Sequence, residues 1–260
     1  MKKGKKLYEG KAKILFASTD KNLAIQHFKD DTTAFNNQKK VNIEGKGILN
    51  NRISEHVLSA LKDVGIDNHL VKRLNMREQL IDLVDIIPIE FIIRNIVTGS
   101  LTERLDIEDG TKLNRPLLEF CYKSDKLGDP LIAREHIYAF EWASKIELDY
   151  ITEQCLRIND FLLGMFKSVG IKLVDFKLEF GKRKSDGKIV LADEISPDTC
   201  RLWDADTDKK LDKDRFRKDL GEVVEAYQEI ARRLGILHEQ VNNIRPIKFT
   251  KPTAVKIKKK

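Results

Sequence analysis

The chain has 260 residues, of which 41% are hydrophobic and 34% are charged. This is the composition of a globular protein, and the length allows one large core or two closely associated lobes. No apolar run approaches the roughly 18 residues that span a bilayer, and no apolar segment follows the basic start as in a signal peptide. We therefore expect a cytoplasmic protein with no membrane partner.

The formal net charge of +7 is concentrated at the two ends of the chain. Ten lysines lie there, and subtracting their charges from +7 leaves −3 for the body: Lys2, Lys3, Lys5, Lys6, Lys248, Lys251, Lys256, Lys258, Lys259 and Lys260. A basic tail can bind RNA. The acidic balance of the body instead favours a solvated tail and predicts no nucleic-acid partner, with an RNA-binding module as the non-enzymatic alternative.

Three scattered cysteines and five isolated histidines argue against a disulfide framework and against a histidine-ligated metal site. An odd number of cysteines fits a reducing compartment. Cys121, Cys155 and Cys200 are therefore expected to be small, buried thiols.

The first elements predicted along the chain are two strands, over residues 7–16 and 23–28. The polar stretch 29–47 then predicts a mobile loop, and apolar residues at helical spacing predict a helix over 48–64. The next strand covers residues 86–97, where Pro88 favours a sheet edge or the start of the strand.

Two more helices follow. One begins after Ser144, which forms a capping box with Glu147, and ends at Gly170; the other covers residues 214–234. Strands and helices are mixed without a regular βαβ rhythm, which favours an α+β fold. A boundary near residues 85–88 divides the chain into lobes of residues 1–86 and 87–245, followed by a basic tail of residues 246–260.

The strongest chemical pattern is LVDFKLEFG at residues 173–181. Apolar residues occupy one face of this strand, and Asp175, Lys177 and Glu179 occupy the other, about 7 Å apart. A solvent-exposed strand with a ladder of charges would show the same pattern. A turn at residues 184–187 then leads into a returning strand that carries more acids.

The length of that turn decides which acid lies opposite Glu179. A two-residue turn places Glu194 there, and a three-residue turn places Asp193 there, which is the register that we predict. Either register brings like charges together across a sheet, which is unfavourable unless a cation neutralises them. Carboxylates gathered in this way suit Mg²⁺ and a nucleotide phosphate. The pattern therefore indicates a metal–nucleotide site.

Three further segments carry polar groups. Residues 10–13 (GKAK) lie between strands and could cover a polyphosphate, although an exposed lysine pair explains them equally well and no Walker motif is present. Arg94 near Ser100 indicates an anion site at a helix start, with a simple capping box between Ser100 and Glu103 as the alternative. The loop 193–204 follows the acidic strand and is rich in functional groups.

Together these motifs resemble those of the SAICAR synthetase family, the ligases of purine biosynthesis. The matching stretches follow the family's order from residue 7 to about 240: LYEGKAK (7–13), KGILNN (46–51), PIEFIIRNIVTGSL (88–101), LVDFKLEFG (173–181), DEISPDTCRLWD (193–204) and DKDRFR (212–217). The resemblance implies a two-lobed α+β fold related to ATP-grasp, with the active site between the lobes. It also implies that ATP, carboxyaminoimidazole ribonucleotide and L-aspartate react through an acyl phosphate to give the succinocarboxamide, ADP and phosphate.

The resemblance further implies roles in binding ATP and Mg²⁺. Four residues should cover the ATP phosphates: Gly10, Lys11, Ala12 and Lys13. Glu179 and Asp193 should hold the nucleotide Mg²⁺, and Asp175 a metal near the substrate carboxylate. Lys177 lies between these acids, where it would neutralise the transferring phosphoryl group.

The other implied roles concern the substrates. Three residues should bind the 5′-phosphate of the ribonucleotide: Arg94, Ser100 and Arg201. Asp198 and Arg217 are weaker candidates for its imidazole or carboxylate end. Three lysines could recognise the carboxylates of L-aspartate: Lys39, Lys40 and Lys46.

The loop around Phe35 and Asn36 lacks the acid that some family members have there, so we assign it no metal role. The tail from about residue 247 has no counterpart in the family pattern. The resemblance favours a homo-oligomer. The alternative enzyme is a small-molecule kinase that uses the same Mg·ATP site but stops at phosphorylation.

Overall fold

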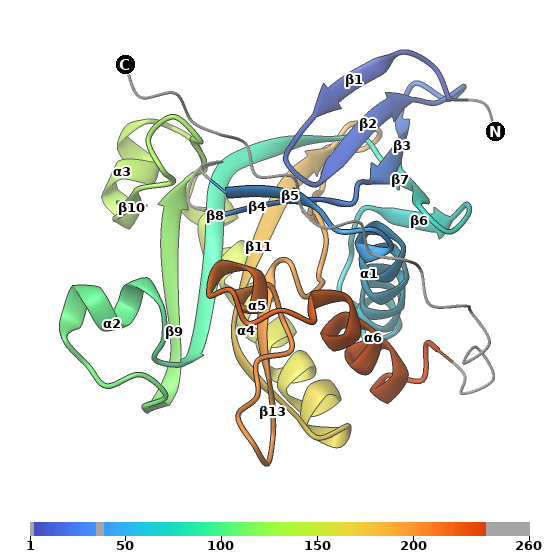
Figure 1. The fold of residues 1–260 in the computed structure, drawn as a ribbon. Coiled ribbons are helices and arrows are strands. Elements are labelled where there is room, and N and C mark those ends of the chain that lie inside the picture. The colour runs from blue at the N-terminus through green and yellow to red at the C-terminus, as the bar shows by residue number, and fades with distance from the viewer. Residues whose placement is uncertain (1–2, 35–38, 238–260) are drawn as a thin grey trace, which may run out of the picture.

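The computed structural model describes residues 3–34 and 39–237, which form two main sheets flanked by helices (Figure 1). The first sheet has the strand order β1-β2-β3-β7-β6. The second has the order β10-β9-β8-β11-β12, with β13 also paired to β11. The strand pairs of both sheets are antiparallel, and helices are interspersed with them along the chain, so the predicted α+β class is confirmed.

The first sheet comes from the N-terminal part of the chain. Its strands are β1 (Lys6–Glu9), β2 (Lys13–Ala17), β3 (Leu23–Phe28), β6 (Leu70–Arg73) and β7 (Glu78–Asp82). Residues 10–13 were predicted to lie between strands, and they form the hairpin that joins β1 to β2, in which the Gly10 amide donates to the Lys13 carbonyl. Helix α1 (Lys46–Asp63) was predicted at nearly these bounds and packs against this sheet through its apolar stripe.

The stretch 29–47 was predicted as a mobile loop, and this prediction was wrong for its described residues. They contain β4 (Asp31–Ala34) and β5 (Lys39–Asn42), which pair as a small separate sheet. Thr32 and Thr33 point to opposite faces of β4 and are both buried, and β-branched residues such as threonine favour the strand conformation. The predicted position of Phe35 and Asn36 lies outside the described residues.

The second sheet carries most of the core. Its strands are β8 (Val84–Ile96), β9 (Lys112–Tyr122), β10 (Leu131–Ile132), β11 (Ile171–Arg183), β12 (Ile189–Ala192) and β13 (Cys200–Asp204). Pro88 predicted a sheet edge or the start of the strand, and both alternatives were wrong, because β8 lies between β9 and β11 and begins before Pro88, at Val84. The proline is tolerated since the β8–β11 register shifts between Glu90 and Ile86, so no ladder bond is lost there.

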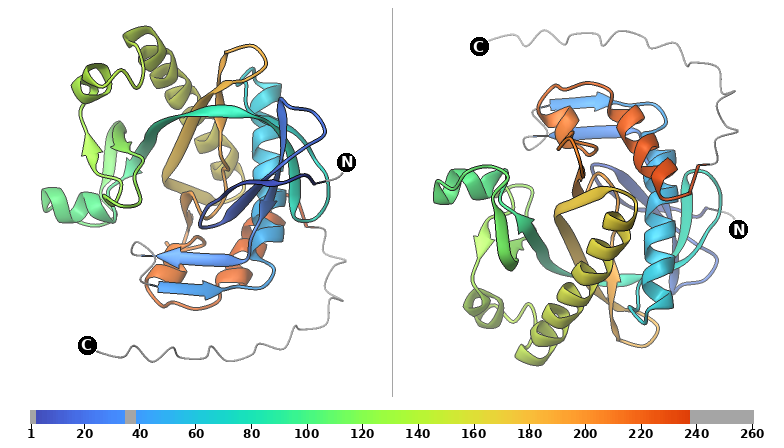
Figure 2. Two further views of the ribbon diagram at one scale, coloured as in Figure 1. Left: turned by 90° about the horizontal axis from the view of Figure 1, so that it is seen from above. Right: turned by 90° about the horizontal axis from the view of Figure 1, so that it is seen from below.

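Helix α4 (Lys145–Ser168) supports the second sheet from one side (Figure 2). Its first turn has the predicted capping box, in which Ser144 accepts from the Glu147 amide and Glu147 from the Ser144 amide. Phe91 packs edge to face against Phe120 and Phe180 in the core beneath the sheet. This packing makes the second sheet a rigid platform, on whose opposite face the site can be built.

The helix predicted over residues 214–234 is divided into α5 (Asp214–Arg217) and α6 (Val223–Arg233). Three residues between these two helices have a positive φ, a conformation in which a right-handed helix cannot continue: Asp219, Gly221 and Glu222. Helix α6 packs beside α1, so the C-terminal part of the described chain returns to the helix of the first sheet. Two other short helices are α2 (Ser100–Leu105) and α3 (Arg134–Ala139).

The three cysteines are free and buried, as predicted. None of the helices in the described part of the chain combines the length and apolar character that a membrane crossing needs.

The strands of the first sheet lie within residues 6–82 and those of the second within 84–204. The lobe boundary at residues 86 and 87 stays a prediction, and the basic tail of residues 246–260 lies outside the described residues.

Candidate active site

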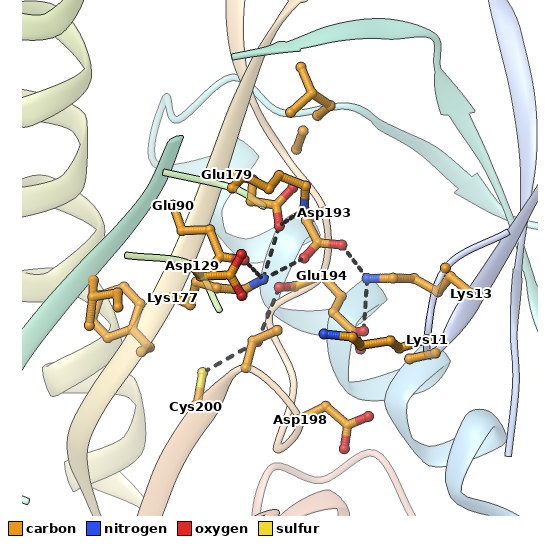
Figure 3. Close-up of a pocket in the computed structure, with 18 of the residues that line it drawn as sticks. Lys11, Lys13, Glu90, Asp129, Lys177, Glu179, Asp193, Glu194, Asp198 and Cys200 are labelled. Carbon is orange, nitrogen blue, oxygen red and sulfur yellow. Dashed lines mark hydrogen bonds and ion pairs between the residues drawn. The ribbon is translucent and has the colours of Figure 1, made fainter. Parts of the chain in front are cut away.

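A cleft of about 730 Å³ lies between the two sheets. Its walls come from the 10–13 hairpin, the end of β7 with the following β8, strand β11, the loop 193–201 and the α5 region. Figure 3 shows that acidic and basic side chains from these segments meet inside the cleft. The sequence-predicted residues on these segments therefore share one cavity.

The polar face of β11 forms the floor of the cleft, with Asp175, Lys177 and Glu179 lining it. The Lys177 ammonium lies 2.7 Å from Glu90, 2.9 Å from Glu179 and 4.0 Å from Asp193. Burial opposes its charge, but the three carboxylates outweigh this and raise the pKa of Lys177 well above its usual value. Asp175 and Glu179 are each 4% exposed, so this face is not the solvated charge ladder considered from the sequence.

The predicted register between Glu179 and the returning strand was wrong. Ala192 lies opposite Glu179, because the turn at residues 184–187 is longer than either alternative that we considered. The like-charged residue opposite Glu179 is Glu90 on β8, and Lys177 bridges the two. Asp193 still reaches the cluster, because its left-handed backbone (φ 61°) ends the strand before it.

The 10–13 hairpin places its two lysines across the cleft. Lys13 pairs with Asp193 and lies 2.8 Å from Glu194, and Lys11 lies 2.7 Å from Asp125. Burial alone would raise the pKa of Asp193, but Lys13 and Lys177 together hold it well below its usual range. Gly10 and Ala12 form the cleft wall beside these lysines. Lys13 thus ties the hairpin to the acidic loop of the second sheet.

The acidic cluster has the donor chemistry for a magnesium ion. Within residues 3–34 and 39–237, no three acidic, histidine or cysteine side chains converge as in a closed metal site. A nucleotide-bound Mg²⁺ needs only one or two protein carboxylates, because phosphates and water complete its shell. Glu179 and Asp193 supply such oxygens, and the cations already among them, including Lys123 at 2.6 Å from Glu179, show that positive charge is stabilised there. The residues therefore fit the ion.

The other end of the cleft is built around Asp175. One of its oxygens, Oδ2, accepts from Arg94 at 2.9 Å and from Arg201 at 2.7 Å. Arg94 also donates to Glu119 at 2.7 Å and to the Ser100 hydroxyl at 3.2 Å. The structure thus brings Arg94, Ser100 and Arg201 together, as an anion site requires. In this arrangement the contacts of Asp175 are arginines.

The capping box considered for Ser100 and Glu103 is absent. The residue before helix α2 is Gly99, and no side chain caps this six-residue helix. A Cβ atom on Gly99 would lie 2.6 Å from the Arg201 guanidinium. The backbone of Gly99 has φ 58° and ψ −135°, a conformation that essentially only glycine adopts. Gly99 therefore lets Arg201 approach the backbone, and the side chains rather than a helix end make up the anion site.

A third polar group surrounds Asp198. Its carboxylate accepts from the fully buried Lys46 at 2.5 Å and from the Tyr227 hydroxyl at 2.6 Å. Lys213 and Arg217 also line the cleft here. Three lysines were predicted to recognise L-aspartate. Lys46 contacts the cleft residue Asp198, whereas Lys39 pairs with Asp219 and Lys40 with Asp31.

Five site residues were not singled out from the sequence: Glu90, Lys123, His69, Lys213 and Tyr227. Glu90 could have been found, because Ile89, Phe91 and Ile93 are buried and the residues between them, including Glu90 and Arg94, face the cleft. Lys213 lies within the DKDRFR stretch quoted for the family, whereas Lys123, His69 and Tyr227 carry no local signal. The His69 ring is buried beside Asp193 and Lys13, and burial lowers its pKa to about 4.

Comparisons with known proteins agree with this geometry. The model of the family described as SAICAR synthetase matches residues 6–234. A phosphoribosylaminoimidazole-succinocarboxamide synthase of Pelagibacter ubique (strain HTCC1062) is 70% identical over 261 aligned positions, which cover 100% of both chains. A crystal structure of the synthase of that name from Ehrlichia chaffeensis is 51% identical, with a TM-score of 0.89 over 90% of this chain and 100% of the other. A SAICAR synthetase in complex with ADP is 45% identical, with a TM-score of 0.84 over 87% and 96%. The chain therefore belongs to the SAICAR synthetase family and has its α+β fold, as its motifs indicated.

Proposed function

We propose that the chain is an ATP-dependent ligase that joins L-aspartate to the carboxylate of carboxyaminoimidazole ribonucleotide through an acyl phosphate. The products are the succinocarboxamide ribonucleotide SAICAR, ADP and phosphate. The observation that carries the proposal is the protonated Lys177, held among Glu90, Glu179 and Asp193 and faced by the lysine hairpin. Family membership supports the ligase over the small-molecule kinase.

The chemistry explains why such a site is needed. A carboxylate resists attack by an amine, because it is negatively charged and would have to expel an oxide. Transfer of the ATP γ-phosphoryl group to a carboxylate oxygen makes that oxygen part of a phosphate leaving group. The amine nitrogen then forms the C–N bond, phosphate departs with the oxygen, and the nitrogen loses its proton. Phosphoryl transfer depends on positioning and charge neutralisation, so no covalent nucleophile of the protein is required.

Each part of the acidic end has a proposed role. Lys177 stabilises the charge that develops on the transferring phosphoryl group, as a preorganised cation in a partly dry cleft. Lys11 and Lys13 cover the ATP phosphates from the hairpin, with Gly10 and Ala12 allowing the backbone to approach. Glu179 and Asp193 would hold Mg²⁺, which would neutralise phosphate charge when bound.

At the other end, Arg94, Ser100 and Arg201 bind the 5′-phosphate of the ribonucleotide. Asp175 holds the two guanidinium groups in place through Oδ2, and neither arginine uses its Oδ1. We propose that Oδ1 faces the substrate carboxylate, where it would also serve the second metal that the family resemblance implies. Arg217 and Asp198 complete the substrate side of the cleft.

We also propose that the two lobes bind different ligands. Residues 1–86 hold the nucleotide, and residues 87–245 hold the metal and the ribonucleotide. It also includes a cytoplasmic homo-oligomer, for which sedimentation of the purified chain is the test.

The decisive experiment incubates the chain with ATP, Mg²⁺, the ribonucleotide and L-aspartate. ADP and the succinocarboxamide should form together, and only when both substrates are present. With ¹⁸O in the ribonucleotide carboxylate, one label should appear in the released phosphate, because that oxygen leaves with it. ADP formed without the amide would favour the kinase, and amide formed without transfer of label would exclude the acyl phosphate.

A further inference from the structure

Among the described residues, Asp212 is the one buried acid that no cation neutralises. Six aspartates and glutamates are buried there, and five of them pair with a lysine or arginine: Glu119, Asp175, Glu179, Glu194 and Asp214. Asp212 is 0% exposed, and no lysine, arginine or histidine nitrogen lies within 4.0 Å of its carboxylate in the described part of the chain. A buried carboxylate without a cation is costly, so its remaining contacts show what it stabilises.

The carboxylate of Asp212 holds two backbone segments together. Its Oδ2 accepts from the Leu202 amide and its Oδ1 from the Asp214 amide, each at 2.7 Å. Leu202 lies on β13 directly after Arg201, and Asp214 is the first residue of α5. Asp212 therefore joins the strand that carries Arg201 to the start of α5. It does so from behind the cleft wall, because the residues that line the cleft include Arg201 but not Asp212.

Both segments fix the guanidinium group of Arg201. Its Nε donates to the Asp214 carboxylate at 3.0 Å, and its Nη1 donates to Asp175 at 2.7 Å. The Asp214 carboxylate also accepts from Arg217 at 2.6 Å. A shift of α5 away from β13 would move Asp214 and would change the direction in which the Arg201 guanidinium points.

We propose that Asp212 is a positioning residue, whose ionised carboxylate holds β13 and α5 at the spacing that aims Arg201 at the phosphate of the ribonucleotide; this rests on the proposed ligase function. An ionised carboxylate accepts through both of its oxygens. A protonated acid or an asparagine keeps one acceptor oxygen and turns a donor toward the other amide. The link between β13 and α5 is therefore weakened whenever the residue at position 212 is neutral.

The surroundings of Asp212 make its ionisation sensitive to pH near neutrality. Burial, together with the nearby charge of Asp214, raises the pKa of Asp212 to about 7, although the two amides oppose this. The charged and titratable groups that face it come from β13, the segment between β13 and α5, α5 itself and α6: Cys200, Arg201, Lys210, Asp214, Arg217 and Tyr227. The ionised fraction of Asp212 therefore falls from about nine-tenths at pH 8 to about one-tenth at pH 6.

The test compares the pH dependence of KM in the wild type and in Asp212→Asn. Because only the ionised form positions Arg201, the wild-type KM for the ribonucleotide should rise about tenfold from pH 8 to pH 6. The substrate phosphate, with a second pKa of about 6, adds a change of roughly twofold that both chains share. Asp212→Asn should show only this shared change, and its KM for the ribonucleotide at pH 8 should be at least about tenfold above that of the wild type.

Two controls accompany this comparison. The KM for ATP should stay within about twofold in both chains, because Arg201 is not proposed to bind ATP. The matched variant is Asp206→Asn, which changes an exposed aspartate just after β13 and should behave as the wild type at every pH.

Thermal unfolding separates positioning from a purely structural role. The folded-state pKa of Asp212 lies above its unfolded value of 3.8, so its ionisation costs stability as the pH rises past about 7, and asparagine lacks this cost. Asp212→Asn should therefore have a melting temperature at pH 8 no lower than that of the wild type, although its KM for the ribonucleotide is higher. A lower melting temperature with equal rises in both KM values would show a structural role and would overturn the proposal.

If Asp212→Asn does not fold, the wild-type chain decides. A rise in its KM for the ribonucleotide of no more than the shared, roughly twofold change between pH 8 and pH 6 would overturn the proposal. A wild-type chain that makes no succinocarboxamide would refute the ligase itself. A chain that makes it, but whose KM for the ribonucleotide is the same with aspartate or asparagine at position 212, would refute the positioning role alone.

Discussion

Replacement of Lys177 by methionine tests the central claim about the acidic cluster. The substitution keeps the length of the side chain and removes the ammonium that contacts Glu90 and Glu179. Loss of one preorganised group that stabilises developing charge costs about 2.7–4 kcal/mol of barrier, which corresponds to a fall in kcat of about 10²–10³.

The variant also leaves two carboxylates opposite each other across the β8–β11 pair without the cation between them. Glu179 is buried, so we expect a lower melting temperature as well as lower activity. Lys177→Arg restores the charge and should restore most of the stability, while its planar fork should leave activity well below that of the wild type. Comparison of the two variants separates the electrostatic role in catalysis from the role in folding.

The assay is formation of ADP and succinocarboxamide under single-turnover conditions, with thermal unfolding followed in parallel. Lys172→Met is the matched control, because Lys172 is on the same strand but pairs with Asp208 near the surface. A fall in rate of less than tenfold in a folded Lys177→Met chain, about 1.4 kcal/mol of barrier, would refute the assigned role.

Three further predictions follow from individual contacts. Asp175→Asn removes the buried charge that pairs with the buried Arg94 and the half-buried Arg201, so urea unfolding should show a loss of about 3–5 kcal/mol and turnover should fall at least about 100-fold. An unchanged stability would contradict the ion-pair network. Gly99→Ala should raise the KM for the ribonucleotide about tenfold or more through strain and displacement of Arg201, with the KM for ATP as the internal control. His69 is buried and neutral, so its imidazole has a pKa of about 4 in the folded chain and 6.5 in the unfolded chain. As the pH falls from 6.5 toward 4, the free energy of unfolding should decrease, because only the unfolded chain binds the proton. Between about pH 7 and 4.5 the wild type should lose roughly 2.5 kcal/mol more than His69→Gln; equal losses would show that this ring is not buried neutral.

Local patterns predicted the elements that carry their own signal. The alternation in residues 173–181 identified β11 and the three side chains on its polar face, because the period of a strand is a local property. The capping box at Ser144 located the start of α4 for the same reason. The family motifs, rather than periodicity, supplied the roles of residues such as Arg94 and Arg201.

Other features depended on conformations that the sequence pattern does not specify. The register of β12 depends on the length of one turn. The break between α5 and α6 depends on the positive φ angles of Asp219, Gly221 and Glu222. Neither follows from hydrophobic periodicity. The pairs Lys13–Asp193 and Lys46–Asp198 join residues far apart in the chain, so they form only after the sheets have come together.

Carboxylates gathered as in this cluster require cations, but a bound metal ion is not the only source of them. The cations that neutralise Glu179 and Asp193 in this structure belong to the chain itself, and they are Lys177, Lys123 and Lys13. Under the proposed function, a nucleotide phosphate that binds Lys13 competes with Asp193 for the same ammonium. Each phosphate contact on the hairpin therefore releases negative charge on the facing loop, which favours the binding of a divalent cation there. Anion binding at the hairpin and cation binding beside β11 are thus coupled by charge alone.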